Sequence, residues 1–275
     1  MTAKRAGVMG WPVAHSRSPR LHGYWLKHYS IDGSYVHLPV APSDLADALS
    51  HLEANGFAGV NLTVPHKEAA LSLVDEVSPQ AARIGAINTI FVNNGRLTGT
   101  NTDAYGFMAA LKDSAPAYDP TARPAVVIGA GGAARAVCFA LQDAGCPDIR
   151  LVNRTLSRAQ ALARDFGKPV AAHDWDRRNQ SLSDAGLVVN CTTMGMTGQA
   201  PLDLDLALLP ASAVVNDIVY TPLDTPLLAT ARARGHGVVD GLGMLLYQAQ
   251  AGFEGWFGVK PAVTPALRAH VLGAP

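Results

Sequence analysis

The sequence predicts a two-domain α/β protein, and three observations lead to this prediction. Hydrophobic residues make up 48% of the 275 residues and charged residues only 16%, which is typical of a chain that buries parallel sheet. Apolar runs alternate with helical patterns, as in successive βαβ units. One such unit, residues 125–155, carries a glycine-rich turn between its first strand and its helix. The length is long for one domain and comfortable for two.

The first domain is predicted to be an α/β unit over residues 1–105. Ser18, which precedes Pro19, is expected to be the N-cap of its first helix. The pair Asn94-Gly95 predicts a hairpin between two strands. The expected strands are 6–10, 35–40, 59–64, 88–92 and 96–100, and the expected helices are 19–29, 43–54, 65–77 and 103–112.

The second domain, residues 106–240, is predicted to be a Rossmann-type dinucleotide-binding domain. A proline-rich linker, residues 114–124, precedes its first strand. Two last helices, 243–257 and 264–272, are expected to return to the first domain, so that residues 241–275 complete it. A cleft between the two domains is expected. Strands are expected near Ala125, Ile149, Val170, Leu187, Val214 and Val238, with helices near Ala133, Leu156 and Leu227.

The turn at residues 129–134 fits the dinucleotide-binding pattern G-x-G-x-x-A. Gly129 allows the tight turn, Gly131 lets the backbone approach a pyrophosphate, and Ala134 lets helix and strand pack closely. The free amides and the dipole at the start of the helix favour the phosphates. The alternative is a glycine-rich turn without a ligand. The candidate pyrophosphate-binding residues are Gly129, Ala130, Gly131, Gly132 and Ala133.

The end of the second strand of this βαβ unit indicates which dinucleotide is bound. An acidic residue there would bind the ribose 2'-hydroxyl of NAD. This chain instead has Asn153, Arg154 and Thr155, with Arg158 one turn further on. Arginines at this place suit a 2'-phosphate. The sequence therefore predicts NADP rather than NAD.

Composition excludes several other classes of function. Lysine plus arginine equals aspartate plus glutamate at 22 each, so no net charge attracts nucleic acid or an anionic membrane, and we expect a small-molecule ligand. The nine histidines show no metal-ligand spacing, so no metal is expected. The three cysteines form no C-x-x-C pair, and neither a secretory signal nor a membrane span is evident. These features predict a cytoplasmic enzyme, while the pattern does not separate a monomer from a homodimer.

Polar residues at strand ends of the first domain suggest where chemistry takes place. Reduction of a carbonyl group by a nicotinamide needs a proton donor, and few side chains serve at neutral pH. Lys67 is the candidate, with Asp103 to orient it and hold its charge. Taken singly, each could be a helix-end charge, and the sequence does not show that they meet. Lys67 is the more informative residue, because the helix dipole disfavours a cation in the first turn.

Seven short segments lie in order along nearly the whole chain. They are HSRSP at 15–19, NLTVPHK at 61–67, GAINT at 85–89, GTNTDAYG at 99–106, GAGGAARA at 129–136, NRT at 153–155 and GLGMLLYQA at 241–249. Together they resemble the shikimate dehydrogenase family, far more specifically than any one motif does. The resemblance implies a two-domain enzyme that uses NADP to interconvert 3-dehydroshikimate and shikimate on the route to chorismate and the aromatic amino acids.

The resemblance also implies roles for individual residues. Lys67 and Asp103 match the catalytic pair of the family. Neutral hydroxyl groups would bind the substrate carboxylate without burial of an arginine. The matching residues are Ser16, Ser18 and Tyr220 for the carboxylate; Thr63, Asn88 and Gln248 for the substrate hydroxyls; Ile218 and Gly241 for the nicotinamide; and residues 129–133 and 153–158 for the phosphates.

Two alternatives remain open from the sequence. A quinate/shikimate dehydrogenase would accept one more hydroxyl group on the ring and often uses NAD, against which Arg154 argues. A noncatalytic NADP-binding sensor on the same scaffold would have no need of both Lys67 and Asp103.

Overall fold

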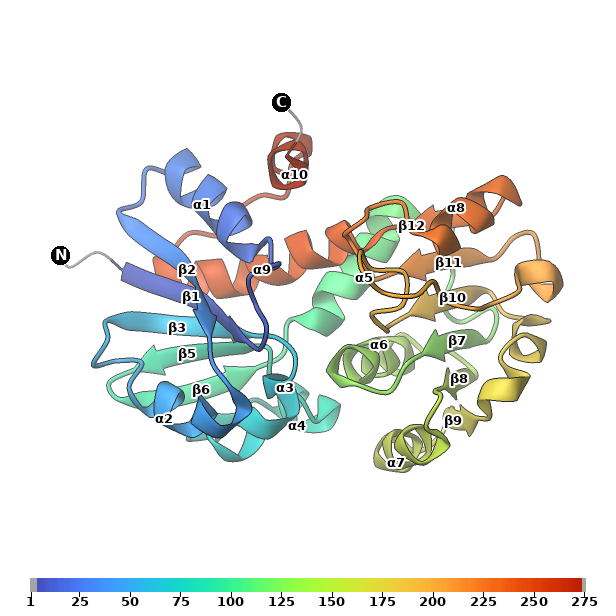
Figure 1. Ribbon diagram of the computed structural model, residues 1–275, viewed down its shortest axis with the longest axis horizontal. Helices are drawn as coiled ribbons and strands as arrows, with labels where there is room; N and C mark the ends of the chain where they lie inside the picture. Colours follow the sequence, from blue (N-terminus) through green and yellow to red (C-terminus); the bar gives the residue numbers. More distant parts are fainter. Residues whose placement is uncertain (1–3, 274–275) are drawn as a thin grey trace. The chain divides into compact units, whose positions relative to one another are not determined.

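The computed structural model describes residues 4–273, and the chain divides into two compact units. Within the described residues, unit 1 comprises 4–103 and 245–273, and unit 2 comprises 104–244. Each unit has a central sheet with helices on its two faces (Figure 1). Helix α9, Gly241–Phe257, begins in unit 2 and ends in unit 1.

The sheet of unit 1 has six strands in the order β2-β1-β3-β5-β6-β4. Strands β1, β2 and β3 are parallel, whereas β5 runs antiparallel to both β3 and β6. The predicted hairpin is present, with Asn94 at φ 51° and Gly95 at φ 75°. The strands are β1 Lys4–Gly10, β2 Gly33–Pro39, β3 Phe57–Leu62, β4 Glu76–Val77, β5 Thr89–Asn93 and β6 Arg96–Thr100.

Two kinds of core lie on the two faces of this sheet. The face covered by α1 and α9 is aromatic, with His22, Trp25, Tyr35, Phe253 and Trp256 in mutual ring contact. The face covered by α2, α3 and α4 is mainly aliphatic (Figure 1). The helices are α1 Ser18–His28, α2 Leu45–Ser50, α3 His66–Ala69, α4 Pro79–Ile84 and α10 Pro265–Leu272, with 3-10 turns at Pro42–Asp44 and Ala70–Ser72.

The predicted helix over 65–77 is wrong beyond its first turns. Helix α3 ends at Ala69, a 3-10 turn follows, and Glu76–Val77 forms strand β4 beside β6. The backbone amide of Asp75 donates to the carbonyl of Leu97 at 3.0 Å, and its carboxylate accepts from the amide of Leu97 at 2.7 Å. These long-range bonds draw the segment into the sheet, so tertiary contacts override its helical pattern.

The predicted helix over 43–54 is also shorter in the structure. It consists of a 3-10 turn, Pro42–Asp44, and helix α2, which ends at Ser50. The Ser50 hydroxyl and the His51 ring both donate to the carbonyl of Asp47 at 2.8 Å. Side chains that bond a nearby carbonyl compete with the backbone amides that would continue the helix.

The sheet of unit 2 has six parallel strands in the order β12-β11-β10-β7-β8-β9. This is the order of a doubly wound dinucleotide-binding sheet, and all six predicted strands are confirmed. The strands are β7 Ala125–Ile128, β8 Ile149–Val152, β9 Val170–His173, β10 Leu187–Asn190, β11 Val214–Asp217 and β12 Gly237–Val239. The helices are α5 Asp103–Ser114, α6 Gly132–Asp143, α7 Leu156–Phe166 and α8 Pro226–Ala233, with 3-10 turns at Trp175–Arg177, Gln180–Leu182 and Leu206–Leu208.

Within residues 4–273, the helices are too short or too polar to cross a lipid bilayer.

Candidate active site

Lys67 and Asp103 meet in unit 1, although they are 36 positions apart in the sequence. Lys67 lies in α3, which follows the turn after β3, and Asp103 is the first residue of α5. The Lys67 ammonium donates to Asp103 Oδ2 at 2.5 Å, and the two side chains are only 16% and 7% exposed. A charge-assisted bond with little access to water holds the ammonium in one place. The predicted pairing of the two residues is therefore present in the structure.

Asn88 joins this ion pair to the rest of the site. Its Nδ2 lies 2.9 Å from Asp103 Oδ1 and 3.1 Å from Gln248 Oε1. Its Oδ1 accepts from the backbone amide of Thr102 at 2.8 Å. Because a backbone N–H only donates, this contact fixes the orientation of the Asn88 amide. Asn88 and Gln248 are thus brought to the ion pair, and both are buried.

The serine pair lies in the loop before α1 and at its first residue. Ser16 Oγ donates to Ser18 Oγ at 3.2 Å and accepts from the backbone amide of Ser18 at 3.3 Å. The predicted N-cap role of Ser18 is wrong, because the helix begins at Ser18 itself and Arg17 is its N-cap. The Ser18 hydroxyl accepts from Ser16 Oγ instead of from a helix amide. Two neutral hydroxyls therefore lie side by side, as an anion-binding pair requires.

Thr63 lies directly after β3, at the same end of the sheet. Its backbone amide donates to the carbonyl of Met9 at 2.8 Å, and its carbonyl accepts from the amide of His66 at 2.9 Å. A Cβ added at Gly10 would lie 2.4 Å from its methyl group, so Thr63 packs closely against the end of β1. Thr63, the serine loop and α3 thus all follow the carboxyl ends of parallel strands, where open α/β sheets bind ligands.

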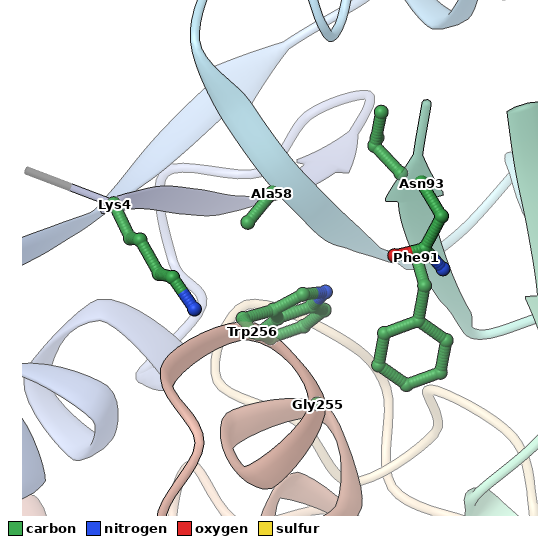
Figure 2. Close-up of a pocket in the computed structure, with 7 residues that line it drawn as sticks. Lys4, Ala58, Phe91, Asn93, Gly255 and Trp256 are labelled. Carbon is green, nitrogen blue, oxygen red and sulfur yellow. The ribbon is translucent and has the colours of Figure 1, made fainter. Parts of the chain in front are cut away.

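A cavity of about 370 Å³ lies elsewhere in unit 1, next to the start of β1. Figure 2 shows the Trp256 indole and the Phe91 ring beside Lys4 and Asn93. Because Lys4 is the first residue of β1, this cavity lies at the sheet end opposite to Gly10 and Thr63. None of the predicted substrate-binding residues lines it, so its volume does not mark the site of the chemistry.

The glycine turn of unit 2 has the predicted geometry. Gly129 has φ +112°, and a Cβ there would lie 3.0 Å from the side chain of Thr192. Gly131 is the N-cap of α6, and a Cβ placed on it would have no neighbour within 4 Å. Ala134 is fully buried. Open space therefore lies beside Gly131 at the start of α6, where the helix amides would bind a pyrophosphate.

The predicted 2'-phosphate residues lie between β8 and the first turn of α7. Arg154 and Arg158 are exposed, and Thr155 is the N-cap of α7 without a side-chain cap bond. The Asn153 amide donates to the carbonyl of Thr155 at 2.9 Å, which fixes the loop. Two cations and the amide groups of a helix start suit a phosphate group.

Ile218 and Gly241 are in contact within unit 2. A Cβ added at Gly241 would lie 2.1 Å from the carbonyl oxygen of Ile218, so only glycine lets α9 start here. Tyr220 belongs to the same loop of unit 2, whereas the other predicted carboxylate ligands belong to unit 1.

Asp217 is a buried carboxylate that the sequence reasoning missed. It is 0% exposed and accepts from Asn190 Nδ2 at 3.0 Å, Thr225 Oγ1 at 2.7 Å and the amide of Val219 at 3.0 Å. Burial raises its pKa to about 6, and these hydrogen bonds oppose the shift only in part. Asn190 also donates to the carbonyl of Met194 at 3.0 Å, so Asp217 joins two loops of unit 2.

A signal for Asp217 was present in the sequence. Asn190 ends one apolar strand and Asp217 ends the next, and the two residues are paired in register. Polar residues at the ends of two adjacent buried strands lie together at the carboxyl edge of a parallel sheet.

Among the described residues 4–273, the structure holds no group of three or more histidine, cysteine, aspartate or glutamate side chains arranged to bind a metal ion. Cys138, Cys146 and Cys191 are free thiols.

The doubly wound sheet with its open glycine turn, together with a lysine–aspartate pair among neutral hydroxyl and amide groups, defines a dehydrogenase that binds a nicotinamide dinucleotide. Three family models match the chain: the shikimate dehydrogenase substrate binding domain at residues 8–90, shikimate / quinate 5-dehydrogenase at 115–197, and the shikimate 5'-dehydrogenase C-terminal domain at 241–269. The chain belongs to the shikimate dehydrogenase family.

Individual relatives agree with this assignment. Shikimate dehydrogenase (NADP(+)) of Paramagnetospirillum magneticum is 60% identical over 98% of this chain and 98% of its own length. The solved shikimate 5-dehydrogenase of Thermus thermophilus, in complex with NADP(H) and shikimate, has a TM-score of 0.87 and 41% identity, and covers 98% of this chain and 99% of its own. Quinate dehydrogenase from Corynebacterium glutamicum in complex with NAD has a TM-score of 0.90 and 32% identity, with coverage of 98% and 99%.

Proposed function

We propose that the protein catalyses the reversible, NADP-dependent reduction of 3-dehydroshikimate to shikimate. The observation that carries this proposal is the shielded ion pair of Lys67 and Asp103, with Asn88 and Gln248 bonded beside it. The family membership of the chain supports the same reaction. Unit 1 would bind the substrate, and unit 2 would bind the dinucleotide.

The substrate carries one carboxylate and several hydroxyl groups, and the site offers partners for both. We assign the carboxylate to Ser16 and Ser18, whose hydroxyls lie 3.2 Å apart. Thr63, Asn88 and Gln248 are assigned to the substrate hydroxyls, since amide groups both donate and accept. Tyr220 remains a prediction as a further carboxylate ligand.

Proton transfer is the task of Lys67. During reduction its ammonium donates a proton to the carbonyl oxygen as that oxygen becomes an alkoxide, and during oxidation the neutral amine accepts the proton from the substrate hydroxyl. Asp103 holds the ammonium by the bond of 2.5 Å and balances its charge. Asn88 in turn bonds the second oxygen of Asp103 at 2.9 Å, so the carboxylate is fixed at both ends.

The residues of unit 2 fit NADP, which when bound supplies or accepts the hydride. Residues 129–133 would hold the pyrophosphate at the uncapped start of α6. Asn153, Arg154, Thr155 and Arg158 would hold the 2'-phosphate. Ile218 and Gly241 are assigned to the nicotinamide because they match the family's residues at that place.

We also propose a cytoplasmic location, since the three cysteines are free thiols of the kind that persist in a reducing compartment. A monomer or homodimer is expected, which sedimentation analysis would distinguish.

Oxidation of quinate with NAD is the second candidate, because the quinate dehydrogenase of Corynebacterium glutamicum is similar over 98% of this chain. Arg154 favours NADP, because NAD has no phosphate at that ribose.

The test is a spectrophotometric assay of nicotinamide reduction with shikimate or quinate, each with NADP or NAD. We expect fast turnover with shikimate and NADP and slow turnover with the other three pairs. Lys67→Ala should lose turnover while calorimetry still detects shikimate binding. The exposed lysine of α5, changed as Lys112→Ala, is the matched control and should keep full activity. Absence of turnover with all four pairs, together with NADP binding, would favour the sensor instead.

A further inference from the structure

A chain of buried hydrogen bonds starts at Tyr35, in the middle of β2. The Tyr35 hydroxyl bonds Asn61 Oδ1 at 2.6 Å. Asn61 Nδ2 donates to the carbonyl oxygen of Asn88 at 3.2 Å and to Thr89 Oγ1 at 3.0 Å. Because a carbonyl oxygen only accepts, Nδ2 must face Asn88 and Oδ1 must face Tyr35. The Tyr35 hydroxyl is therefore the donor.

The same chain continues to the ion pair. Thr89 Oγ1 donates to Asn88 Oδ1 at 3.0 Å, and Asn88 Nδ2 donates to Asp103 Oδ1 at 2.9 Å. Tyr35, Asn61, Thr89, Asn88 and Asp103 are each at most 7% exposed. Water does not substitute easily for a missing partner in such a network, and a partly satisfied network is costly.

The Ser18 hydroxyl lies near the other side of the Tyr35 hydroxyl. Burial raises the pKa of Tyr35, and the nearby Ser18 hydroxyl opposes part of this rise. Tyr35 gives its one proton to Asn61, so toward Ser18 it can only accept. Ser18 is itself bonded to Ser16 at 3.2 Å. The Tyr35 hydroxyl thus lies between the proposed carboxylate-binding serines and the network that holds Asp103.

The ring of Tyr35 is fixed by the aromatic core. His22 stacks on it with ring centroids 3.9 Å apart and an interplanar angle of 5°. His22 is fully buried, and burial lowers its pKa to about 3, so the stacked ring is neutral. The hydroxyl group therefore has a position set by core packing rather than by the ligand.

We propose that Tyr35 is a positioning residue that ties the Ser16–Ser18 pair to the Asn61–Asn88–Asp103 network and so sets the distance between the carboxylate-binding end and the proton donor. This inference rests on the proposed function of the same site. Tyr35 acts through Ser18 and Asn61, so its loss affects the rate and the shikimate KM and leaves the dinucleotide site intact.

The first test is Tyr35→Phe, which removes the hydroxyl and keeps the stacked ring. Asn61 Oδ1 then loses its donor in a buried place, and we expect kcat/KM for shikimate to fall about tenfold while the KM for NADP stays unchanged. Tyr24→Phe on α1 is the matched control, because Tyr24 is only half-buried and contacts His28 and His270 instead. The control should behave as the wild type.

A double-mutant cycle with Ser18→Ala separates positioning from a general structural role. If Tyr35 acts through Ser18, the loss of kcat/KM caused by Ser18→Ala should be at least about threefold smaller in the Tyr35→Phe enzyme than in the wild type. Effects that multiply fully, or a Tyr35→Phe enzyme within twofold of wild type, would overturn the proposal. If Tyr35→Phe does not fold, Thr89→Val interrupts the same chain beyond Asn61 and must lower kcat/KM about equally. Turnover by the wild type settles the proposed function independently of these variants.

Discussion

The two units each bury an aspartate at the carboxyl edge of their sheet, but they stabilise it differently. Asp103 in unit 1 has a cation, the Lys67 ammonium, at 2.5 Å. Asp217 in unit 2 is fully buried and receives hydrogen bonds from the neutral groups of Asn190, Thr225 and Val219. A buried carboxylate therefore serves two purposes in this protein: paired with a cation it holds a proton donor in place, and with neutral donors alone it fixes loops.

The units also differ in the sign of their response to pH. His22 in unit 1 is a base held neutral by burial, with a pKa lowered to about 3. Asp217 in unit 2 is an acid whose pKa burial raises to about 6. Acidification therefore works against the fold of unit 1 and in favour of the fold of unit 2.

The largest effect is expected from one chemical change made in both units. Asp103→Asn should lower kcat by about a hundredfold or more, because Lys67 loses both its counter-charge and its orientation. Asp217→Asn should stay within about tenfold of wild type, since an amide oxygen still accepts from Thr225. Steady-state kinetics with shikimate and NADP measure both variants, with circular dichroism to check folding. Equal losses would remove the distinction between the two aspartates.

Arg154→Ala tests a further contrast between the units: we expect Lys67 of unit 1 to transfer a proton, whereas Arg154 of unit 2 only binds the cofactor. We expect the KM for NADP to rise about 10- to 100-fold, the loss of a charge-assisted bond, with kcat little changed. The KM for NAD should not change. Arg164→Ala, an exposed arginine near the other end of α7, is the control. A fall in kcat without a change in KM would contradict the assignment.

His22→Phe should remove an acid-sensitive contribution to the stability of unit 1. In the wild type the unfolded chain takes up a proton below about pH 6.5, whereas the folded chain does so only near pH 3. The free energy of unfolding of the wild type should therefore fall by about 2 kcal/mol as the pH drops from about 6.5 to 5. Urea unfolding followed by tryptophan fluorescence measures it, because three of the four tryptophans, Trp11, Trp25 and Trp256, lie in unit 1. A variant that loses as much stability on acidification as the wild type would refute the prediction.

Asp217→Asn should show the opposite sign in unit 2, with a smaller effect. The wild-type aspartate destabilises the fold as pH rises from about 4 to 6, because the unfolded chain ionises first. Relative to wild type, the variant should gain about 1 to 2 kcal/mol between pH 5 and pH 7. Urea unfolding followed by circular dichroism at the two pH values gives this difference. A constant difference at both pH values would show that Asp217 is not protonated on folding.

Strands were predicted well because their signal is local. The six parallel strands of unit 2 each combine an apolar run with a turn residue, and the sequence alone places them. The helix predicted over 65–77 failed because Asp75 bonds Leu97, a partner 22 positions away that no local pattern reveals.

The site shows the same division. Lys67 and Asp103 were identifiable by their chemistry, and the expectation that they pair came from the needs of proton transfer. Tyr35 looked like an ordinary strand residue, because its importance depends on Asn61 and His22, which lie far from it in the sequence. The pattern Ser18-Pro19 predicts a helix cap, whereas in the structure α1 begins at Ser18 and Arg17 is its N-cap.

The order of the chain also sets the order in which its parts become available during synthesis. Unit 2 is contiguous, so all of its residues have been synthesised before residue 245 is added. Unit 1 is complete only with α9, which brings Phe253 and Trp256 to the aromatic core and Gln248 to Asn88 beside the ion pair. We therefore expect a nascent chain in which the dinucleotide-binding half folds first, and in which the half made earliest becomes catalytic last.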